Sequence, residues 1–423
     1  MKNESVSKEI VLQSQSRKLR AAVFEHGELM EVFEQESDSS YLVGNIYRGR
    51  VENVLPGMQA AFVDIGLDKN AFLYVGDAVP PRFEEDESIS FADSVRIEHI
   101  LKPRQELLVQ VIKEPVGTKG ARISVNISLP GRYVVLLPQV SHIGVSQKIT
   151  DDDERMRLRE LAEKFKPQSM GVIIRTLAEG IGGEEIAEDI VQLVGSWRFL
   201  QSKILHVSVP GIVHKDVDLI TKLVRDWIDK DVEKITVDQN GLAQILRESL
   251  QEINHPAAKH VLIVTGEDIF ARYGVDDEIR KTLRPKVWLK SGGYLVIQQT
   301  EALTVIDVNT GKYVGQRSLE ETVVHTNIEA AKEIARQLRL RNLGGIIIID
   351  FIDMTAKEDQ QLVINGLETA CARDKTRSQV LGLTQLGLVE MTRKKVGQTL
   401  EVRYTALCPT CDGSGRVCEG YCD

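Results

Sequence analysis

No apolar run in the 423-residue sequence approaches the ~20 residues that a membrane-spanning helix requires. The first residues, 1–18, also lack the apolar core of a secretory signal, so we expect no cleaved leader. Cysteines are scarce: there are five, too few for a disulfide framework in so long a chain, and four of them lie between 408 and 422. These absences predict a cytoplasmic protein whose cysteine-rich tail binds a metal.

The sequence also has no excess of basic residues, since its formal net charge is −9 and nucleic-acid-binding domains are often basic. This balance does not exclude RNA, because only the binding groove needs Lys and Arg, and acids gather elsewhere, at 84–86 and 151–154. The eight histidines show no His-x-His or HExxH spacing, so none is a candidate general base.

Short strands separated by turns dominate the N-terminal part of the chain. A hairpin is predicted over 20–35, and short strands follow between 44 and 113, a pattern typical of a small closed barrel. Residues 119–206 mix strands with amphipathic helices, whereas 204–280 alternate strand and helix as an α/β layer does. The length and this pattern predict several compact units.

Two aspartates end apolar strands in the C-terminal part. In LTVIDVN, residues 303–309, the strand period places Asp307 and Asn309 on one face. Asp350 ends the run Ile346–Ile349, which we expect to be apolar on both faces, as central strands are. A carboxylate at the end of so apolar a strand requires a cation or hydrogen bonds, and strand ends are where α/β sheets form their sites.

Two interpretations of these aspartates follow from the spacing. If the strands are neighbours, Asp307 and Asp350 converge on one hard cation such as Mg²⁺, which prefers carboxylate oxygen. Alternatively, Asp350 caps the next turn and Asp307 pairs with an arginine. Asp353, in FIDM, is a further candidate ligand.

The segment EALTVIDVNTG, followed by ARQLRLRNLGGIIIIDFIDM, resembles the catalytic core of the ribonuclease E/G family, and the resemblance extends over roughly 15–415. It implies an Mg²⁺-dependent endoribonuclease that hydrolyses single-stranded RNA to 5′-phosphate and 3′-hydroxyl ends, in rRNA processing and mRNA decay. By resemblance, Asp307 and Asp350 bind the Mg²⁺ and Asn309 orients the scissile phosphate. A rival class is a non-catalytic RNA-binding or assembly factor, which would not need both carboxylates.

The resemblance also implies an α/β fold of several subdomains. The expected units are an RNase H-like subdomain in two parts (1–40 and 207–280), an inserted OB-type RNA-binding barrel (41–118), a 5′-sensor (119–206), a DNase I-like catalytic subdomain (281–402) and a zinc-link tail (403–423).

Aromatic residues make up only 5% of the chain, which makes those in the barrel segment informative. OB barrels bind single strands by stacking bases on aromatic rings in a basic groove. By resemblance, Phe62 and Phe72 stack on RNA and Lys113 contacts it. The alternative is a purely structural role, in which both phenylalanines belong to the barrel core. Further backbone contacts are expected from three residues of the first barrel strand: Tyr47, Arg48 and Arg50.

The resemblance predicts a pocket that prefers a 5′-monophosphate. The segment GVIIRT supplies Arg175 and Thr176, and DKTRSQV supplies Arg377. Guanidinium groups bind phosphate in a bidentate manner, and a hydroxyl adds a hydrogen bond. The segment KGARIS adds Gly120 and Ser124 by resemblance. The alternative is ordinary surface arginines.

The tail contains Cys408-Pro-Thr-Cys411, which resembles the family signature in which two thiolates from each of two protomers share one Zn²⁺. The resemblance therefore implies a homodimer. Cys418 and Cys422 leave open a zinc site closed within one chain. Because the sequence stops at Asp423, where family members continue into a domain that pairs dimers, we do not expect a tetramer. The remaining cysteine, Cys371, is interpreted as a buried helix residue.

Overall fold

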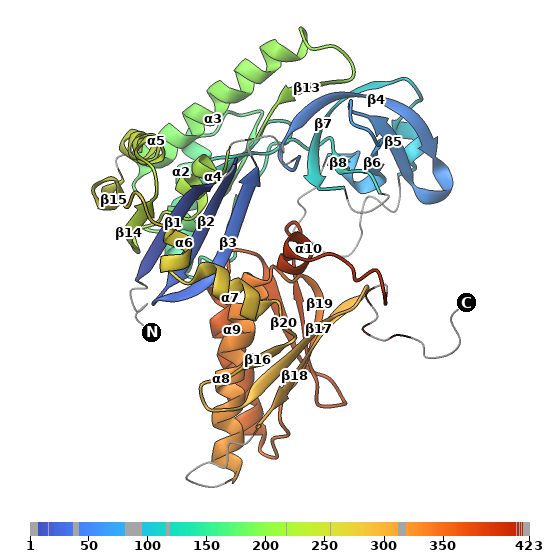
Figure 1. Ribbon diagram of the computed structural model, residues 1–423. Coiled ribbons are helices and arrows are strands. Elements are labelled where there is room, and N and C mark those ends of the chain that lie inside the picture. The colour runs from blue at the N-terminus through green and yellow to red at the C-terminus, as the bar shows by residue number, and fades with distance from the viewer. Residues whose placement is uncertain are drawn as a thin grey trace.

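The computed structural model describes residues 7–15, 17–36, 42–80, 95–115, 119–216, 218–253, 255–311 and 319–411, together with 413, 415 and 417. Its strands form four sheets, and helices are distributed among them. Figure 1 shows the closed barrel in the upper part of the molecule, away from the C-terminal sheet and its two long helices in the lower part. This mixed α/β architecture agrees with the predicted fold class at the level of its sheets and barrel.

The first sheet, here called the split sheet, combines strands from two distant parts of the chain. Its order is β15-β14-β1-β2-β3, and β1 pairs in parallel with β14. The predicted hairpin is confirmed: β2 and β3 are antiparallel, and His26 and Gly27 turn between them with φ of 51° and 78°. The five strands are β1 (Lys8–Gln15), β2 (Lys18–Glu25), β3 (Glu28–Glu36), β14 (Val232–Val237) and β15 (Val261–Ile263).

Helices cover both faces of the split sheet. One apolar cluster joins its strands to α4 (Leu219–Asp226) and α5 (Asn240–Glu252). A second joins the opposite face to α6 (Ile269–Arg272) and α7 (Val275–Thr282), and it includes residues of the C-terminal part of the chain.

The second sheet closes into a small barrel because β4 pairs with both β5 and β7. A bulge at Glu52 in β4 and another at Ile112 in β7 help to curve it. Two strands from outside 41–118 also belong to this sheet: β8 pairs with β6 and β7, and β13 pairs with β4. The elements are β4 (Ile46–Leu55), β5 (Ala60–Asp64), β6 (Ala71–Tyr74), α1 (Ile97–Ile100), β7 (Glu106–Lys113), β8 (Arg122–Ser124) and β13 (Gly211–His214).

A four-stranded sheet and two helices lie between the barrel and the split sheet along the chain. Asp151 caps the first helix, because its carboxylate accepts from the N–H groups of Asp153 and Glu154 at 3.0 and 3.1 Å. The elements are β9 (Leu129–Pro130), β10 (Val134–Leu137), β11 (Ile143–Val145), α2 (Asp152–Phe165), β12 (Gly171–Ile174) and α3 (Gly183–Ile204).

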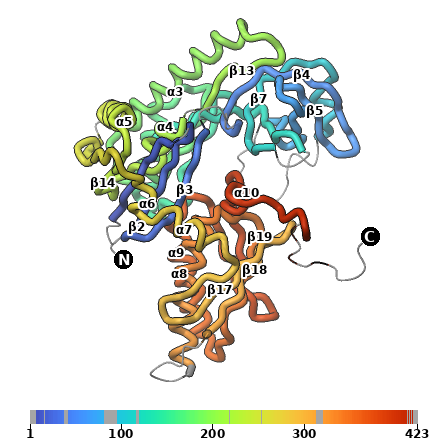
Figure 2. The backbone as a smooth tube through the Cα atoms, in the orientation of Figure 1, coloured from blue at the N-terminus to red at the C-terminus, as the bar shows by residue number. Residues whose placement is uncertain are grey.

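The C-terminal sheet has the order β16-β17-β18-β19-β21-β20. An apolar stripe of α8 packs on one face of it: Ala331, Ile334, Ala335 and Leu338 recur at helical spacing and are at most 5% exposed. Figure 2 shows α8 and α9 on the same side of these strands. The elements are β16 (Lys286–Trp288), β17 (Tyr294–Gln299), β18 (Leu303–Asn309), α8 (Leu319–Leu340), β19 (Gly345–Asp350), α9 (Lys357–Ala372), β20 (Ser378–Leu383), β21 (Val389–Arg393) and, after them, α10 (Leu400–Tyr404).

The opposite face of the C-terminal sheet, here called the open face, is not covered by any described helix. The expectation that the strand Ile346–Ile349 is buried on both of its faces is therefore wrong. Ile347 and Ile349 are fully buried, but Ile346 is 51% exposed because it lies on the open face. One face of this strand is exposed to solvent and the other is buried, although the strand is central in the sheet.

Within the described part of the chain, no helix combines the length and apolar character needed to cross a bilayer.

Candidate active site and nucleic-acid interface

Asp307 and Asp350 are direct neighbours across the two central strands of the C-terminal sheet. β18 and β19 are parallel, and Asp307 lies opposite Asp350 in their register. Register partners project from the same face of a sheet and neighbouring strands lie ~4.8 Å apart, so the two carboxylates emerge side by side on the open face. Asn309 lies on that face too, and its Nδ2 donates to Asp307 Oδ2 at 2.8 Å. The structure thus brings the three predicted side chains together.

The structure also favours the metal interpretation of the two aspartates over its alternative. Neither carboxylate has a Lys or Arg ion-pair partner among the described residues. Asp350 caps no described helix, since α9 begins after Ala356. Both side chains are exposed. Two unpaired like charges held side by side repel, and a divalent cation relieves that repulsion.

The donor set suits a hard cation that keeps part of its hydration shell. No group of three or more His, Cys, Asp or Glu side chains able to hold a metal occurs in the described parts of the chain. The protein therefore offers two carboxylates and an amide, which leaves several positions for water or phosphate, as Mg²⁺ requires. Asp353 is exposed in the loop after β19, so it stays a further candidate.

The barrel carries a row of side chains that crosses five of its strands. Phe62 lies opposite Phe72, and their rings meet edge to face with centroids 6.1 Å apart. Phe72 is also the register partner of Arg122, which lies opposite Lys113. Asn53 extends the row on the other side of Phe62. Both phenylalanines are only half-buried, and neither belongs to the cluster of buried residues that forms the barrel core, so the core interpretation of these rings is not favoured.

Arg122 is the member of this row that sequence reasoning missed. Its Nε donates to Asp77 Oδ2 at 2.8 Å, and its guanidinium lies 5.8 Å from the ring centre of Tyr74. The resemblance carried by the segment KGARIS points only to its glycine and its serine. The alternation of β8 was the available signal, because Ile123 enters the barrel core and its neighbours must face outward.

The three residues of β4 predicted to contact the RNA backbone do not offer free side chains. Tyr47 is 5% exposed and belongs to the barrel core. Arg48 is committed to Glu106 at 2.8 Å and to the carbonyl of Val207 at 3.0 Å. Arg50 lies 3.6 Å from the same glutamate. The expectation of added contacts from these residues is therefore wrong for Tyr47, and the arginines chiefly link the barrel to the segment after α3.

Arg175 follows β12 and already holds a carboxylate. Its guanidinium donates to the carbonyl of Gly131 at 2.5 Å and to Asp226 Oδ1 at 2.6 Å. Burial alone would raise the pKa of Asp226, but hydrogen bonds and charges from Arg225 and Arg175 outweigh it and hold that pKa below its ordinary value. Asp226 is thus an anion placed where the resemblance predicts a phosphate.

The loop that carries Arg377 docks against the C-terminal end of α4, where Asp226 is the last helical residue. The ammonium of Lys375 contacts the carbonyl of Asp226 and lies 4.1 Å from the ring centre of Trp227. Thr176 is exposed, and its hydroxyl is 2.9 Å from Ser146 Oγ. Arg377 is exposed as well. The two segments predicted to form the 5′-phosphate pocket therefore meet around Asp226.

Gly120 and Ser124 have structural roles in the barrel. A Cβ at Gly120 would lie 2.0 Å from the carbonyl oxygen of Asn70, so only glycine permits this approach of two backbones. Ser124 is 4% exposed, and its hydroxyl donates to the carbonyl of Asp77 at 3.1 Å. These contacts account for both residues without a ligand.

In the tail, Cys408 is exposed and Cys411 half-buried, whereas Cys418 and Cys422 lie outside the described residues. Backbone N–H groups of Thr410 and Cys411 point to the Cys408 sulfur and hold the pKa of its thiol below the ordinary value. The N–H of Gly415 donates to Cys411 Sγ at 3.3 Å. Such a turn favours the thiolate form of Cys408, the form that binds zinc. Cys371 is buried in α9, as predicted.

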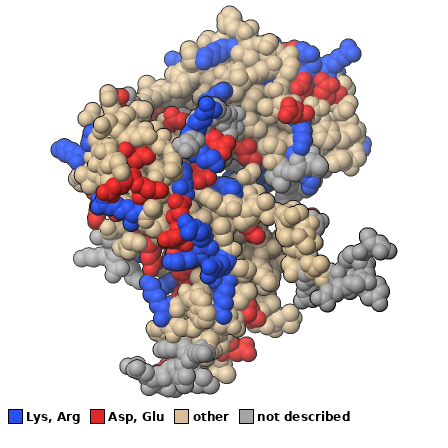
Figure 3. Space-filling model, viewed as in Figure 1, with Lys and Arg blue, Asp and Glu red and all other residues tan. Residues whose placement is uncertain are grey.

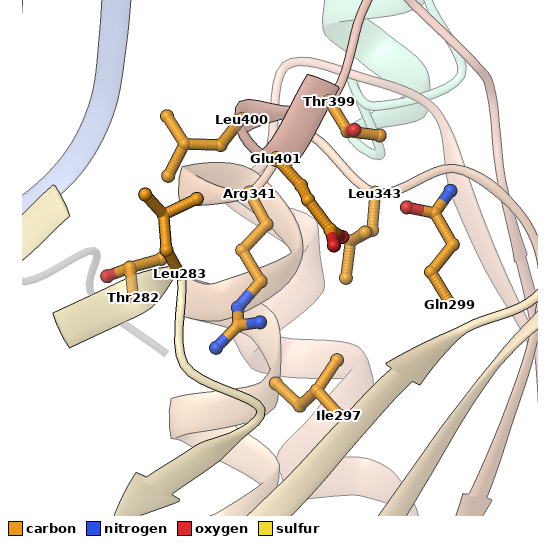
Figure 4. A pocket seen from close by; sticks show the side chains of 9 residues that line it. All are labelled: Thr282, Leu283, Ile297, Gln299, Arg341, Leu343, Thr399, Leu400 and Glu401. Carbon is orange, nitrogen blue, oxygen red and sulfur yellow. The ribbon is translucent and has the colours of Figure 1, made fainter. Parts of the chain in front are cut away.

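A small pocket lies elsewhere, where α7, α8, β17 and α10 meet (Figure 4). Ile297 and Gln299 line it from the side of the C-terminal sheet opposite Asp307, since they alternate with the residues of the open face. Arg341 is committed there to the carbonyl of Arg284 at 2.8 Å and to Gln337 at 2.7 Å. Burial lowers its pKa to about 10. This pocket is therefore a packing feature and not part of the acidic site.

Charge is mixed on the surface. Figure 3 shows Lys and Arg interspersed with Asp and Glu along the middle of the face it draws, over the region where β3, α7 and α8 meet. There the arginines chiefly neutralise acids, for example Arg336 with Glu333 at 2.8 Å. The face drawn thus shows no single basic stripe.

Comparison with known proteins gives consistent similarities. The sequence model of the ribonuclease E/G family matches residues 128–396. Ribonuclease G of Haemophilus influenzae is 44% identical over 411 residues, which are 97% of this chain and 84% of that protein. Ribonuclease G of Escherichia coli is 43% identical over 403 residues, 94% of this chain and 82% of that protein. Ribonuclease E of a Nostoc species is 42% identical over 402 residues, 94% of this chain and 57% of that protein.

Proposed function

Because the chain belongs to the ribonuclease E/G family and is thus an endoribonuclease, we propose that it hydrolyses single-stranded RNA at an Mg²⁺ site formed by Asp307 and Asp350. The products would be 5′-phosphate and 3′-hydroxyl ends. The observation that carries the proposal is the register of β18 and β19, which sets side by side two exposed carboxylates that have no Lys or Arg ion-pair partner among the described residues. A non-catalytic RNA-binding factor would have no need of this arrangement.

Each residue of the site has a separate task. Asp307 and Asp350 would hold the cation, which when bound withdraws charge from the phosphoryl oxygen and lowers the pKa of a water molecule. Asn309 is oriented by its bond to Asp307, which uses one N–H of its amide; the second N–H would donate to a phosphate oxygen.

The barrel would hold the strand on either side of the cut. Phe62 and Phe72 offer half-exposed rings on which bases stack irrespective of sequence. Arg122 and Lys113 continue this row and would contact the backbone phosphates. Most of the row is uncharged, so the overall acidity of the chain does not oppose it.

We further propose a preference for RNA with a 5′-monophosphate, bound by Arg175, Thr176 and Arg377. The convergence of the two segments on Asp226 supports this pocket, and the phosphate would share Arg175 with that carboxylate. Such an enzyme would serve rRNA processing and mRNA decay in the cytoplasm. Its zinc would be bound by Cys408 and Cys411 of two protomers, which makes the working unit a dimer.

The decisive experiment compares Asp307→Asn with the wild type on one fluorescent single-stranded oligonucleotide. We expect unchanged binding and a kcat lower by about 100-fold or more, because a charge that stabilises the transition state is lost. Removal of Mg²⁺ with a chelator should stop the wild type. Glu301→Gln, an exposed acid in the turn after β17, is the matched control and should cut normally. Unchanged cutting by Asp307→Asn would exclude this site, and wild-type protein that binds without cutting would indicate the RNA-binding factor.

A further inference from the structure

One end of the open face carries an aromatic cluster that the acidic site does not explain. Trp288 ends the edge strand β16 and lies opposite Tyr294 on β17. Tyr294 in turn lies opposite Asn309 on β18. Because register partners project from the same face, Trp288, Tyr294 and Asn309 form one row across three strands.

A second row lies directly beside the first. Lys286 on β16 is the partner of Val296, and Val296 is the partner of Asp307, which lies opposite Asp350. The lysine therefore stands on the same face as the acid pair. Two β-strand spacings, about 10 Å, separate β16 from β18. A single-stranded RNA bound at the acid pair can therefore reach Lys286 within a few nucleotides.

The cluster is exposed and preorganised. Trp288 is 63% exposed, although an indole of this size is usually covered. Its ring centroid lies 5.3 Å from that of Tyr294, at an interplanar angle of 59°. The ammonium of Lys286 is 4.2 Å from the Trp288 ring centre and 3.4 Å from that of Tyr294. The cation thus steadies both rings by cation–π contact, while much of the indole stays open.

We propose that Trp288, Tyr294 and Lys286 form a second RNA-binding platform, on which a base next to the scissile phosphate stacks while Lys286 contacts the adjoining backbone phosphate. This inference rests on the proposed RNA hydrolysis. Aromatic faces bind any base, so the platform would hold the strand without selecting its sequence. It is distinct from the barrel row, because it lies on the C-terminal sheet itself.

Single-stranded RNA fits this surface better than a protein partner does. The platform shares its face, and its row, with Asn309, so a strand that presents phosphate to the acid pair passes over it. A protein that covered the two rings would extend over the open face and obstruct the site. An ammonium beside aromatic rings also matches the alternation of phosphate and base in a single strand.

Intrinsic fluorescence gives a direct test, because the chain has three tryptophans and they differ in exposure. Trp197 is 5% exposed, and Trp227 packs between Phe33 and Lys375. We would titrate Asp350→Asn protein, which should bind without cutting, with an unlabelled oligonucleotide. The emission should be quenched with the Kd that anisotropy of a labelled oligonucleotide gives, and Trp288→Phe should abolish most of that quenching.

Kinetics supply the second arm. Trp288→Ala should raise KM by about tenfold with kcat little changed, since a stacking contact is lost. Trp288→Phe should retain most of the affinity, and Lys286→Gln should weaken the salt dependence of KM. Leu381→Ala removes another exposed apolar side chain, 54% exposed on the other edge strand β20, and should leave KM unchanged.

The outcomes separate this inference from the proposed function. If the oligonucleotide is bound and cut but Trp288→Ala leaves KM unchanged, and Trp288→Phe is quenched by the oligonucleotide as strongly as protein that keeps Trp288, the platform is refuted and the nuclease stands. If Trp288→Ala instead dissociates an oligomer in sedimentation and leaves KM unchanged, the surface binds a second copy and the inference is overturned. Wild-type protein that neither binds nor cuts RNA would overturn both.

Discussion

Arg339 connects the helix behind the acidic site to the split sheet, and its removal should be among the most damaging single changes. The residue lies on α8 and its side chain is 2% exposed. Its two terminal nitrogens donate to Glu25 at 2.7 and 3.2 Å, and its Nε donates to Glu31 at 2.9 Å. Those carboxylates are 8% and 12% exposed, so the cluster is enclosed between β2, β3 and α8.

Arg339→Met would leave two buried carboxylates without the cation that is hydrogen-bonded to both. Breaking a buried pair from one side costs about 3–5 kcal/mol, chiefly because the remaining charge stays desolvated. The exposed pair of Arg280 and Asp277, with side chains 74% and 68% exposed, is the matched control, and Arg280→Met should cost less than ~0.5 kcal/mol.

The loss should depend on pH, and the sign follows from the two glutamates. Burial raises the pKa of Glu31 to about 7 despite Arg339. Burial would also raise the pKa of Glu25, but there Arg339, helped by the charges of Lys8 and Arg373, outweighs it and lowers the pKa. Without the arginine both folded-state pKa values would be raised. A carboxyl with a raised pKa destabilises the folded state as pH rises above its unfolded value of 4.5. The penalty should therefore be largest near pH 8 and shrink toward pH 5.

Urea unfolding measures this penalty. The fluorescence of Trp227 follows the transition, since its ring packs against Phe33 of β3 with centroids 5.2 Å apart. A loss below about 1 kcal/mol at pH 8, or one that is equal at pH 5 and pH 8, would refute the assignment of a buried, charged cluster.

Three further predictions follow from the proposed sites. Phe72→Ala should raise KM for a single-stranded oligonucleotide by about tenfold in cleavage assays, with kcat little changed; a fall in kcat alone would contradict base stacking. Arg377→Ala should bring the rates on 5′-monophosphate and 5′-hydroxyl oligonucleotides together, and a preserved difference would exclude Arg377 from the pocket. Cys411→Ser should remove bound zinc, measured by metal analysis, and yield monomers in sedimentation; a dimer that survives would exclude the shared site.

Local patterns predicted the elements of the fold well, because each depends on neighbouring residues. The hairpin over 20–35 follows from a turn at His26 and Gly27 between two apolar strands, and the stripe of α8 follows from helical spacing. The side of β18 on which Asp307 and Asn309 lie was also predictable from the strand period.

Pairing between strands could not be predicted in the same way. Arg122 joins the row of Phe72 only because β8 pairs with β6, across about fifty intervening residues, and Trp288 joins that of Asn309 only through β17. The strand period says which face a residue occupies but not which residue lies opposite it. Partners such as Asp226 for Arg175 depend in addition on how two units dock. The strand pattern identified the two aspartates but left two interpretations open, and the resemblance favoured the metal site.

The run Ile346–Ile349 shows where composition misleads, and it yields a test of the open face. Four isoleucines suggested burial on both sides, yet Ile347 is fully buried under α8 and Ile346 is 51% exposed. Ile347→Ala should therefore cost about 2–5 kcal/mol through the cavity that it leaves, whereas Ile346→Ala should cost under ~1 kcal/mol. Urea midpoints of the two variants, measured in parallel, make the comparison independent of the unfolding model. Equal losses would mean that another surface covers the open face in the folded protein, and that a strand of RNA does not have free access to Asp307 and Asp350.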